Sequence, residues 1–224
     1  MKIDILTLFP NLFNGFLSES IIKRAIEAGK VQINLIDFRK YTKLNNNQVD
    51  DTAFGGGAGM VIMCDPIVSA LEDIKTKDSH VILLDPKGKL YNQKKAQVLK
   101  EYKHLILICG HYEGIDERIK HFVDEVIGIG DYILTGGEVP AMVIADSVIR
   151  LLPGVIAGDS LESESFNNNL LDYPVYTKPR EYRGLEVPEV LLSGDHKKIA
   201  EFRYNEALRL TKENRPDLLE KSNE

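Results

Sequence analysis

The chain lacks apolar runs of membrane-spanning length, has only two cysteines and has no surplus of basic residues. A transmembrane helix requires roughly 20 apolar residues, and no stretch approaches that length. The first ten residues place Asp4 inside an apolar run without a small-residue cleavage site, which predicts a strand rather than a signal peptide. Cys64 and Cys109 stand in apolar contexts without metal-ligand spacing, so we expect reduced core residues. These features predict a cytoplasmic protein with no membrane partner.

The formal net charge is −6, and neither the first 164 residues nor the remainder carries more basic than acidic side chains. Phosphate binding needs Lys and Arg in the contact surface, so bulk electrostatics do not favour a nucleic-acid-binding protein. We expect any polyanionic partner to be held by a local patch. With 224 residues and 43% hydrophobic content, the chain is long enough to bury a large core.

Apolar, β-branched runs alternate with segments of helical periodicity, which predicts an α/β fold with a parallel sheet. The predicted strands are 3–8, 31–36, 81–84, 105–109 and 123–127, and the predicted helices are 20–29, 67–75, 92–102, 140–151, 195–210 and a short one from Pro216. Asp65 is the predicted N-cap of the second helix, and Asn92 and Asp195 are predicted caps of later ones.

Residues 158–169 are polar and turn-rich, which predicts a flexible linker. The predicted domains are therefore residues 1–157, an α/β domain, and residues 170–224, a small and mostly helical domain.

Three glycine-containing turns follow neighbouring predicted strands, at 84–88, 109–114 and 128–137. Strand ends in α/β sheets present backbone groups to ligands, so we expect the three turns to form one pocket. A fourth glycine cluster, at 55–59, fits neither a P-loop nor a dinucleotide fingerprint and predicts a functional loop. His111 is not assigned a role, because a single histidine beside a tyrosine is more often a surface or core residue.

Six motifs in order resemble the bacterial tRNA (guanine-37 N1)-methyltransferase family of knotted, SPOUT-type methyltransferases. They are DDTAFGGGAGM at 50–60, CGHYEGIDER at 109–118, IGDYILTGGE at 129–138, LLDYP at 170–174, YTKPR at 176–180 and VLLSGDH at 190–196. The resemblance spans essentially the whole chain, from Ile3 to Pro216.

The resemblance implies a deep trefoil knot in residues 1–157 that forms the pocket for S-adenosylmethionine. It also implies an obligate homodimer with active sites at the subunit interface, and a C-terminal domain that binds tRNA.

The basic residues of the C-terminal domain are candidates for phosphate contacts, and none is assigned individually: Lys178, Arg180, Arg183, Lys197, Lys198, Arg203 and Arg209. The residues at the family's cofactor contacts are Leu84, Pro86, Gly110, Tyr112, Glu113, Ile129, Gly130, Asp131, Tyr132, Ile133, Leu134, Gly136, Gly137 and Pro140.

Methylation of guanine N1 requires a base for the N1 proton and a donor or cation near O6. In the family these roles belong to an Asp before a Ser-Phe pair and to an Arg at the end of the helix after the last knot loop. Arg150 matches the Arg, whereas Glu164 stands where the family has Asp. Three alternatives remain open: Glu164 is the base, Asp159 or Asp172 replaces it, or activity is reduced or absent.

Other functions compete with this one. The chain is alternatively a related knotted methyltransferase acting on another RNA site, or a non-catalytic RNA-binding module that kept the pocket. The sequence has no cluster with metal-ligand spacing, so we assign no metal ligand and expect any assisting Mg²⁺ to bind loosely.

Overall fold

The computed structural model describes residues 1–157, 164–166 and 168–220. The chain divides into two compact units, residues 1–156 and 157–224, and each is described by itself. Of the predicted linker, residues 158–163 and 167 lie outside the described residues, and Asp159 is among them. The last four residues of the predicted C-terminal domain also lie outside them.

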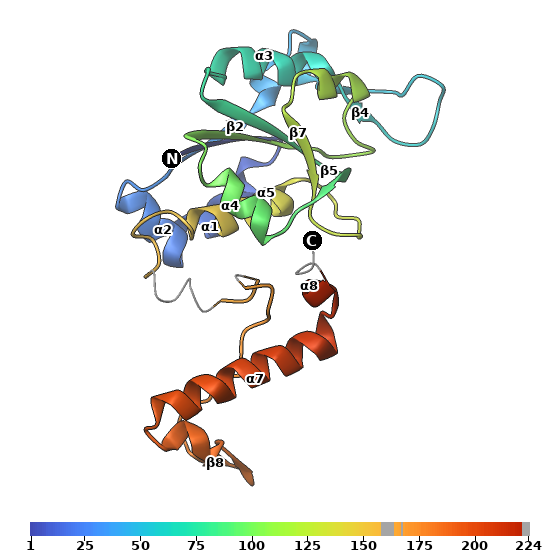
Figure 1. Cartoon of the computed structure of the whole chain (residues 1–224). Coiled ribbons are helices and arrows are strands. Elements are labelled where there is room, and N and C mark those ends of the chain that lie inside the picture. Colours follow the sequence, from blue (N-terminus) through green and yellow to red (C-terminus); the bar gives the residue numbers. More distant parts are fainter. Residues whose placement is uncertain (158–163, 167, 221–224) are drawn as a thin grey trace. The chain divides into compact units, whose positions relative to one another are not determined.

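A five-stranded parallel sheet forms the centre of the first unit, with strand order β2-β1-β6-β5-β7 (Figure 1). The strands are β1 (Lys2–Thr7), β2 (Gln32–Asp37), β5 (Ser79–Leu90), β6 (His104–Cys109) and β7 (Glu125–Gly128). All five predicted strands are present, and the α/β fold with a parallel sheet is confirmed.

Alternation of side chains divides the core into two layers, one on each face of the sheet. Ile3 and Ile5 of β1 are buried in one layer, and Leu6 and Leu8 are buried in the other. This period of two is the expected consequence of the strand pleat. Both faces are apolar because helices cover both of them, as is usual for parallel sheets.

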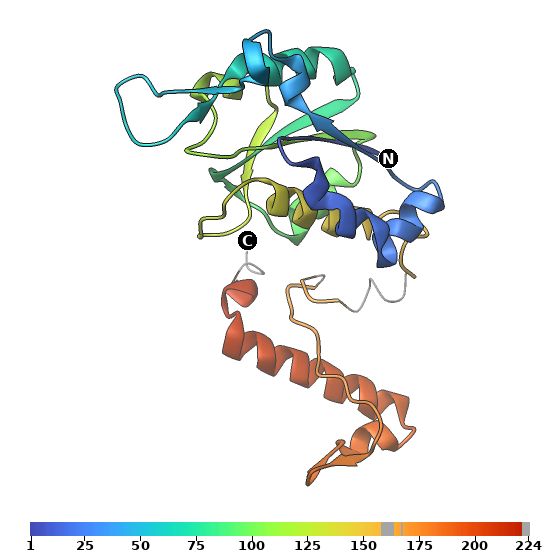
Figure 2. The same ribbon diagram turned by 180° about the vertical axis from the view of Figure 1, so that it is seen from behind.

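Helix α3 and the 3₁₀ segments η2 and η4 cover one face, while α1, α2, α4 and α5 cover the other, as the two opposite views show (Figures 1 and 2). The helical segments of this unit are η1 (Pro10–Phe13), α1 (Asn14–Ser18), α2 (Ser20–Glu27), η2 (Phe38–Tyr41), η3 (Asn45–Asn47), α3 (Cys64–Ile74), α4 (Gln93–Leu99), η4 (Glu117–His121) and α5 (Glu138–Ile149).

The predicted helix caps are partly confirmed. Asn92 accepts a hydrogen bond from the Lys95 amide and caps α4, as predicted. The prediction for Asp65 is wrong: α3 begins earlier, at Cys64, so Asp65 lies in its first turn. There its charge still complements the helix dipole. An Asp at the N-cap and an Asp in the first turn therefore look alike in the sequence. Helix α5 also begins earlier than predicted, at Glu138 rather than Pro140.

The glycine cluster at 55–59 lies in an exposed loop between two short antiparallel strands that the sequence did not predict. These are β3 (Asp50–Asp51) and β4 (Val61–Ile62). The loop projects from the first unit in both views (Figures 1 and 2). Two-residue strands carry no detectable alternation, so periodicity could not reveal them.

The second unit is built on one long helix, α7 (His196–Asn214), with Asp195 as its confirmed N-cap. Before it come a hairpin of β8 (Glu181–Tyr182) and β9 (Leu185–Glu186) and the 3₁₀ segment η5 (Glu189–Leu192), and after it comes α8 (Asp217–Glu220). The hairpin turn uses positive φ at Arg183 and Gly184, as a two-residue type I′ turn requires. Within the described residues this unit is mostly helical.

Candidate active site

The three predicted turns line one cavity of about 270 Å³, beside the middle of β5 and the carboxyl ends of β6 and β7. All of the predicted cofactor contacts line it except Asp131; those that do are Leu84, Pro86, Gly110, Tyr112, Glu113, Ile129, Gly130, Tyr132, Ile133, Leu134, Gly136, Gly137 and Pro140. The wall combines apolar side chains with backbone groups at glycines. Such a wall suits a flat ligand with polar edges. The role of these residues as cofactor contacts stays a prediction.

The first wall of the cavity is an irregularity inside β5 and not a turn after it, which corrects the sequence interpretation. Pairing of β5 with β7 shifts register between Leu84 and Lys89. A side chain at Gly88 would place its Cβ 2.5 Å from the backbone nitrogen of Ile127. Glycine at 88 therefore allows β5 to pair with β7 again after the bulge, and it leaves the intervening residues facing the cavity.

The second wall is the loop after β6, which is joined to the glycine-rich loop. The Glu113 amide donates to the carbonyl of Met60 at 3.1 Å, and the Ile62 amide donates to the carbonyl of Gly114 at 3.0 Å. A Cβ on Gly59, whose φ is +80°, would lie 2.6 Å from Cγ of Glu113. The absence of a side chain at 59 therefore permits close packing of the two loops. The glycine-rich loop thus ends against the wall of the cavity.

The third wall is the loop before α5, and it is fastened to the second. The Gly137 amide donates to the carbonyl of Gly110 at 2.8 Å, and Gly136 forms an isolated antiparallel bridge with His111. A Cβ on Gly137 would lie 2.6 Å from Cα of Cys109. This contact requires glycine because the backbone of β6 occupies the space that a side chain would need.

A buried carboxylate lies behind the second and third walls. Glu138, the first residue of α5, is 3% exposed and accepts a 2.8 Å hydrogen bond from the hydroxyl of Thr7, which is fully buried. Glu138 and the His111 ring both crowd the position that a Cβ on Gly136 would take. Burial, and secondarily the charge of Glu138, raise the pKa of the Cys109 thiol well above its usual value. Cys109 is therefore an inert core thiol at neutral pH.

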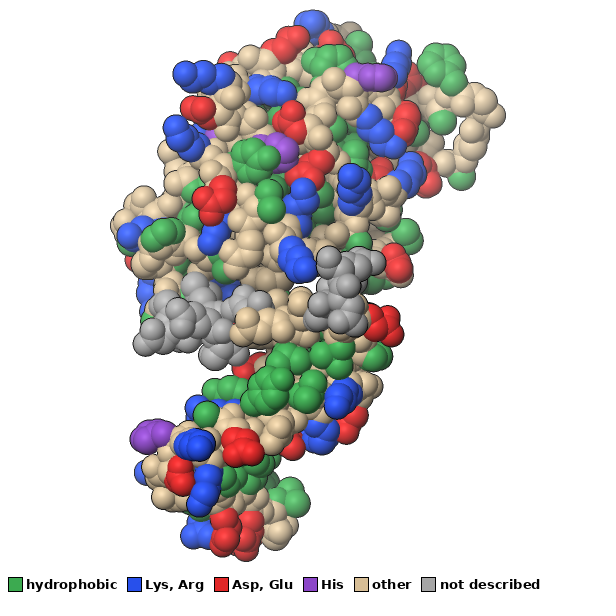
Figure 3. Space-filling view, viewed as in Figure 1, with side chains coloured by type: hydrophobic (Ala, Val, Ile, Leu, Met, Phe, Trp, Pro, Cys, Tyr) green, Lys and Arg blue, Asp and Glu red, His purple; other side chains and the backbone are tan. Residues whose placement is uncertain are grey.

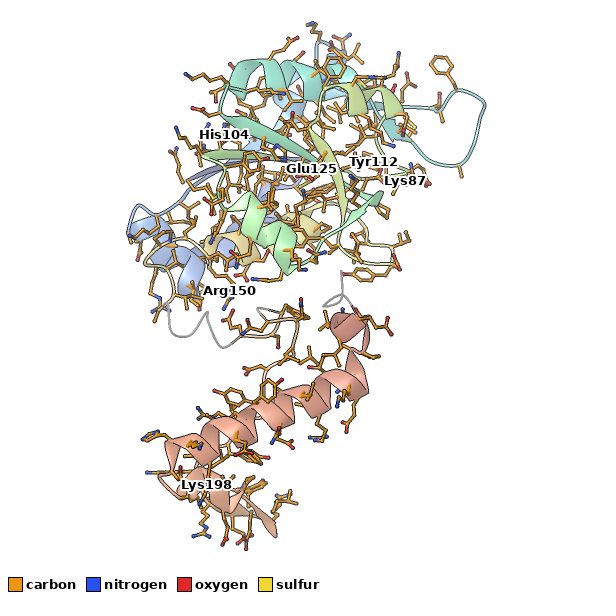
Figure 4. All side chains as sticks on the ribbon, viewed as in Figure 1. Lys87, His104, Tyr112, Glu125, Arg150 and Lys198 are labelled. Atoms are coloured by element: carbon orange, nitrogen blue, oxygen red, sulfur yellow. The ribbon has the colours of Figure 1, made fainter. Side chains whose placement is uncertain are left out.

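Sequence reasoning missed four polar residues of the cavity: Asp85, Lys87, His111 and Thr135. Lys87 and Tyr112 lie near each other at this end of the sheet (Figure 4). Both Asp85 and Lys87 lie inside the predicted turn at 84–88, so their position in that turn could have identified them as cavity residues. His111 lies between two assigned residues, and its ring packs against Phe9 with centroids 4.7 Å apart.

Comparison with known proteins decides the family. A family profile described as tRNA (Guanine-1)-methyltransferase TrmD matches residues 1–221. The chain is 59% identical to a tRNA (guanine-N(1)-)-methyltransferase of Malacoplasma penetrans, covering 97% of this chain and 96% of that protein. It is 56% identical to the enzymes of that name from Ureaplasma urealyticum, with 99% and 97% coverage, and Carboxydothermus hydrogenoformans, with 98% and 87% coverage. The chain belongs to the tRNA (Guanine-1)-methyltransferase family. The family resemblance read from the six motifs is confirmed.

The two predicted catalytic residues of this methyltransferase chain belong to different units. Arg150 is the C-cap of α5 in the first unit. Glu164 belongs to the second unit, where it borders a cavity of about 310 Å³ together with Asp172, Tyr173 and α7 residues such as Arg203. Asp172, the alternative base, receives a 2.8 Å hydrogen bond from the Tyr173 amide on Oδ1.

Among the described residues of this methyltransferase chain, no three His, Cys, Asp or Glu side chains are grouped to hold a metal ion. No helix of residues 1–157, 164–166 and 168–220 is both long and apolar enough to cross a membrane.

Proposed function

We propose that this chain transfers a methyl group from S-adenosylmethionine to N1 of guanine-37 in tRNA, next to the anticodon. The observation that carries the proposal is the family match over residues 1–221, with the cavity lying at two of the family's motifs, 109–118 and 129–138. The relatives are named for the same guanine-N1 methylation.

The residues around the cavity fit S-adenosylmethionine. Leu84, Ile133 and Leu134 supply apolar surface for a flat base, and the glycines at 110, 136 and 137 leave backbone groups accessible at its edge. When bound, the cofactor supplies an electrophilic methyl group. The protein's part is to orient that methyl and to exclude water, and loops joined to one another by hydrogen bonds are suited to both tasks.

Glu164 and Arg150 divide the remaining chemistry. Guanine N1 carries a proton at neutral pH, so Glu164 accepts it as N1 attacks the methyl, and Arg150 stabilises the negative charge that develops on O6. We favour Glu164 over Asp172 because Glu164 directly precedes Ser165 and Phe166, where the family has its Asp. Asp159 lies outside the described residues.

The active form we propose is a homodimer with each site at the subunit interface. Pro140 lines the cavity, but helix α5 rises about 15 Å between Pro140 and Arg150. That rise exceeds the length of an arginine side chain, which supports a site that Arg150 of a second copy completes. Exposed apolar residues at the cavity rim and on α5 offer an interface: Ile133, Leu134, Val139 and Val143 are each more than 40% exposed.

A trefoil knot is part of the proposal. Strand β7 lies at the edge of the sheet, yet the helix that follows it packs against central strands β1 and β6. On its way back the chain contacts the loop after β6, where the Gly137 amide bonds to Gly110. A chain returning beneath an earlier loop is what the knot requires, although such threading is rare.

The second unit is the proposed tRNA-binding domain. Basic and acidic side chains are interspersed on the face in view (Figure 3), so phosphate contacts depend on individual residues. Several candidates are engaged: Arg180 pairs with Glu189, Lys198 with Asp195, and Arg209 with both Glu206 and Glu213. A cytoplasmic location and a loosely held Mg²⁺ stay predictions.

A complementation experiment tests the shared site. Gly137→Ala disrupts the cavity and Arg150→Ala removes the cation, so each homodimer should be inactive. Mixed heterodimers should regain one intact site, with activity near a quarter to a half of the wild-type rate, if the partner supplies Arg150. No recovery in verified heterodimers would contradict the shared site. Saturable cofactor binding without methyl transfer to any RNA would favour the non-catalytic alternative.

A further inference from the structure

The segment that carries Glu164 is fastened to helix α7 by a buried hydroxyl. The Leu171 amide donates a 2.9 Å hydrogen bond to Oγ1 of Thr211, a residue 40 positions away. The same Oγ1 donates to the carbonyl of Ala207 at 2.7 Å, and Thr211 is fully buried. The Thr211 hydroxyl therefore donates its hydrogen bond within the helix and accepts one from the segment that carries Glu164.

Short hydrogen bonds connect this anchor to the residues beside Glu164. The Asp172 amide donates to Oγ of Ser165 at 2.9 Å, and the Phe166 amide donates to the carbonyl of Leu170 at 2.8 Å. These bonds close a turn that joins both residues following Glu164 to the anchored residues 170–172. Fixing Leu171 on α7 therefore restrains the backbone next to the carboxylate.

Two arginines extend the attachment along the helix. The guanidinium of Arg203 lies 4.7 Å from the centroid of the Tyr173 ring, and that of Arg215 lies 5.8 Å from the centroid of the Phe166 ring. Both distances are in the range of cation–π attraction. Arg203 lies within α7 and Arg215 is its C-cap, so the segment is held both along the helix and at its end.

The carboxylate itself shares a cavity with the helix. Glu164 lines the cavity of about 310 Å³ on one side, and Arg203, Tyr204 and Ala207 of α7 line it on another. Helix α7 is therefore one wall of the cavity that Glu164 borders.

We propose that Thr211 is a positioning residue for the catalytic base, and that α7 and the Glu164 segment act as one body. This inference rests on the proposed function of Glu164. When tRNA phosphates bind α7, the helix carries the carboxylate into place. Placement of the base then depends on docking of the second unit and not on cofactor binding.

Thr211→Val and Thr211→Ser in the full-length enzyme test this inference. Valine keeps the shape but removes the acceptor for the Leu171 amide, whereas serine retains it. We expect Thr211→Val to lower the single-turnover methylation rate by between about tenfold and a hundredfold. The KM for S-adenosylmethionine should be unchanged, and Thr211→Ser should stay within about twofold of wild type. A wild-type rate for Thr211→Val would overturn the inference.

Ser165→Ala supplies a second test that does not alter the helix. It removes the bond to the Asp172 amide from a residue outside α7, so a slow rate cannot be attributed to loss of the helix. We expect a reduced single-turnover rate with unchanged cofactor KM; a wild-type rate in a folded Ser165→Ala enzyme would also overturn the inference.

Glu164→Gln separates failure of this inference from failure of the proposed base. If Glu164→Gln is slow and Thr211→Val is not, the base assignment stands and the positioning role fails. If Thr211→Val is slow and Glu164→Gln is not, Glu164 is not the base and Thr211 does not position it.

Discussion

The hydroxyl of Thr7 donates a 2.8 Å hydrogen bond to the carboxylate of Glu138, joining the end of β1 to the start of α5 in a site closed to water. Thr7 also accepts a bond from the Phe9 amide, and Glu138 lies where its charge complements the helix dipole. The pair therefore supports the two cavity walls that meet at Gly136 and His111.

We predict that Glu138→Ala lowers the free energy of unfolding by about 1–3 kcal/mol, because it leaves a buried hydroxyl without its acceptor. Cofactor affinity should fall as well. The double variant with Thr7→Val should lose less than the sum of the two single variants. Urea denaturation and calorimetric cofactor titration provide the measurements, with exposed Glu101→Ala as the control. Unchanged stability in Glu138→Ala would contradict this role.

Gly137→Ala should damage the cavity, because its Cβ would lie 2.6 Å from Cα of Cys109 and 2.9 Å from the Gly110 nitrogen. The φ of Gly137 is −81°, so alanine is not strained there and the change isolates the steric effect. We expect a loss of about 1–3 kcal/mol in stability and weaker cofactor binding. Gly15→Ala is the matched control: apart from its chain neighbours and the backbone of its own helix, no atom lies within 4 Å of its Cβ, and it should be neutral or stabilising. Equal effects of the two changes would refute the steric account.

Glu125 should contribute to stability in a pH-dependent way. Burial acts to raise the pKa of its carboxyl, but hydrogen bonds from Lys95 and His80 outweigh burial and lower it below the ordinary 4.5. A lowered folded-state pKa gives stability that is present above the ordinary value and is lost as pH falls through the folded one.

Lys95→Met should therefore flatten the fall in stability between about pH 5 and pH 3. Chemical denaturation across that range measures it, and Lys77→Met, at an exposed lysine, should retain the wild-type slope. Parallel curves for wild type and Lys95→Met would show that the ion pair does not set the pKa.

Lys197 and Arg209, both on α7, should differ in their effect on tRNA binding. Arg209 pairs with Glu206 at 2.7 Å and Glu213 at 2.9 Å, whereas Lys197 makes no ion pair within residues 1–157, 164–166 and 168–220. We predict that Lys197→Gln weakens tRNA binding and lowers the slope of log binding constant against log salt concentration by about 1. Arg209→Gln should change both the affinity and this slope less. Filter binding at several salt concentrations tests this, and the reverse order would contradict it.

The elements that sequence predicted well are those with long-range periodicity. Burial on both faces makes β1, β5 and β6 nearly continuous apolar runs, and Asn92 and Asp195 cap helices by local chemistry that composition reveals. The β5 bulge was read as a turn because Pro86 and Gly88 are typical of turns. Only the backbone of β7, against which Gly88 packs, explains that glycine.

The sequence likewise predicted the lining of the cavity but not what supports it. The parallel sheet predicted that three loops converge, and the family resemblance assigned their residues. The sequence did not predict the hydrogen bond behind these loops, because Thr7 and Glu138 are 131 residues apart and no local pattern links them. The attachment of Leu171 to Thr211 is likewise a contact between distant segments that only the folded chain reveals.

The most direct test of the central claim is transfer of a labelled methyl group from S-adenosylmethionine to paired tRNA transcripts that differ only at position 37. We predict label on the guanine-37 transcript, none on the adenine-37 transcript, and at least a tenfold loss of rate in Glu164→Gln, as expected when a general base is removed. Equal labelling of both transcripts, or none on either with cofactor still bound, would contradict methylation of guanine-37 by this chain.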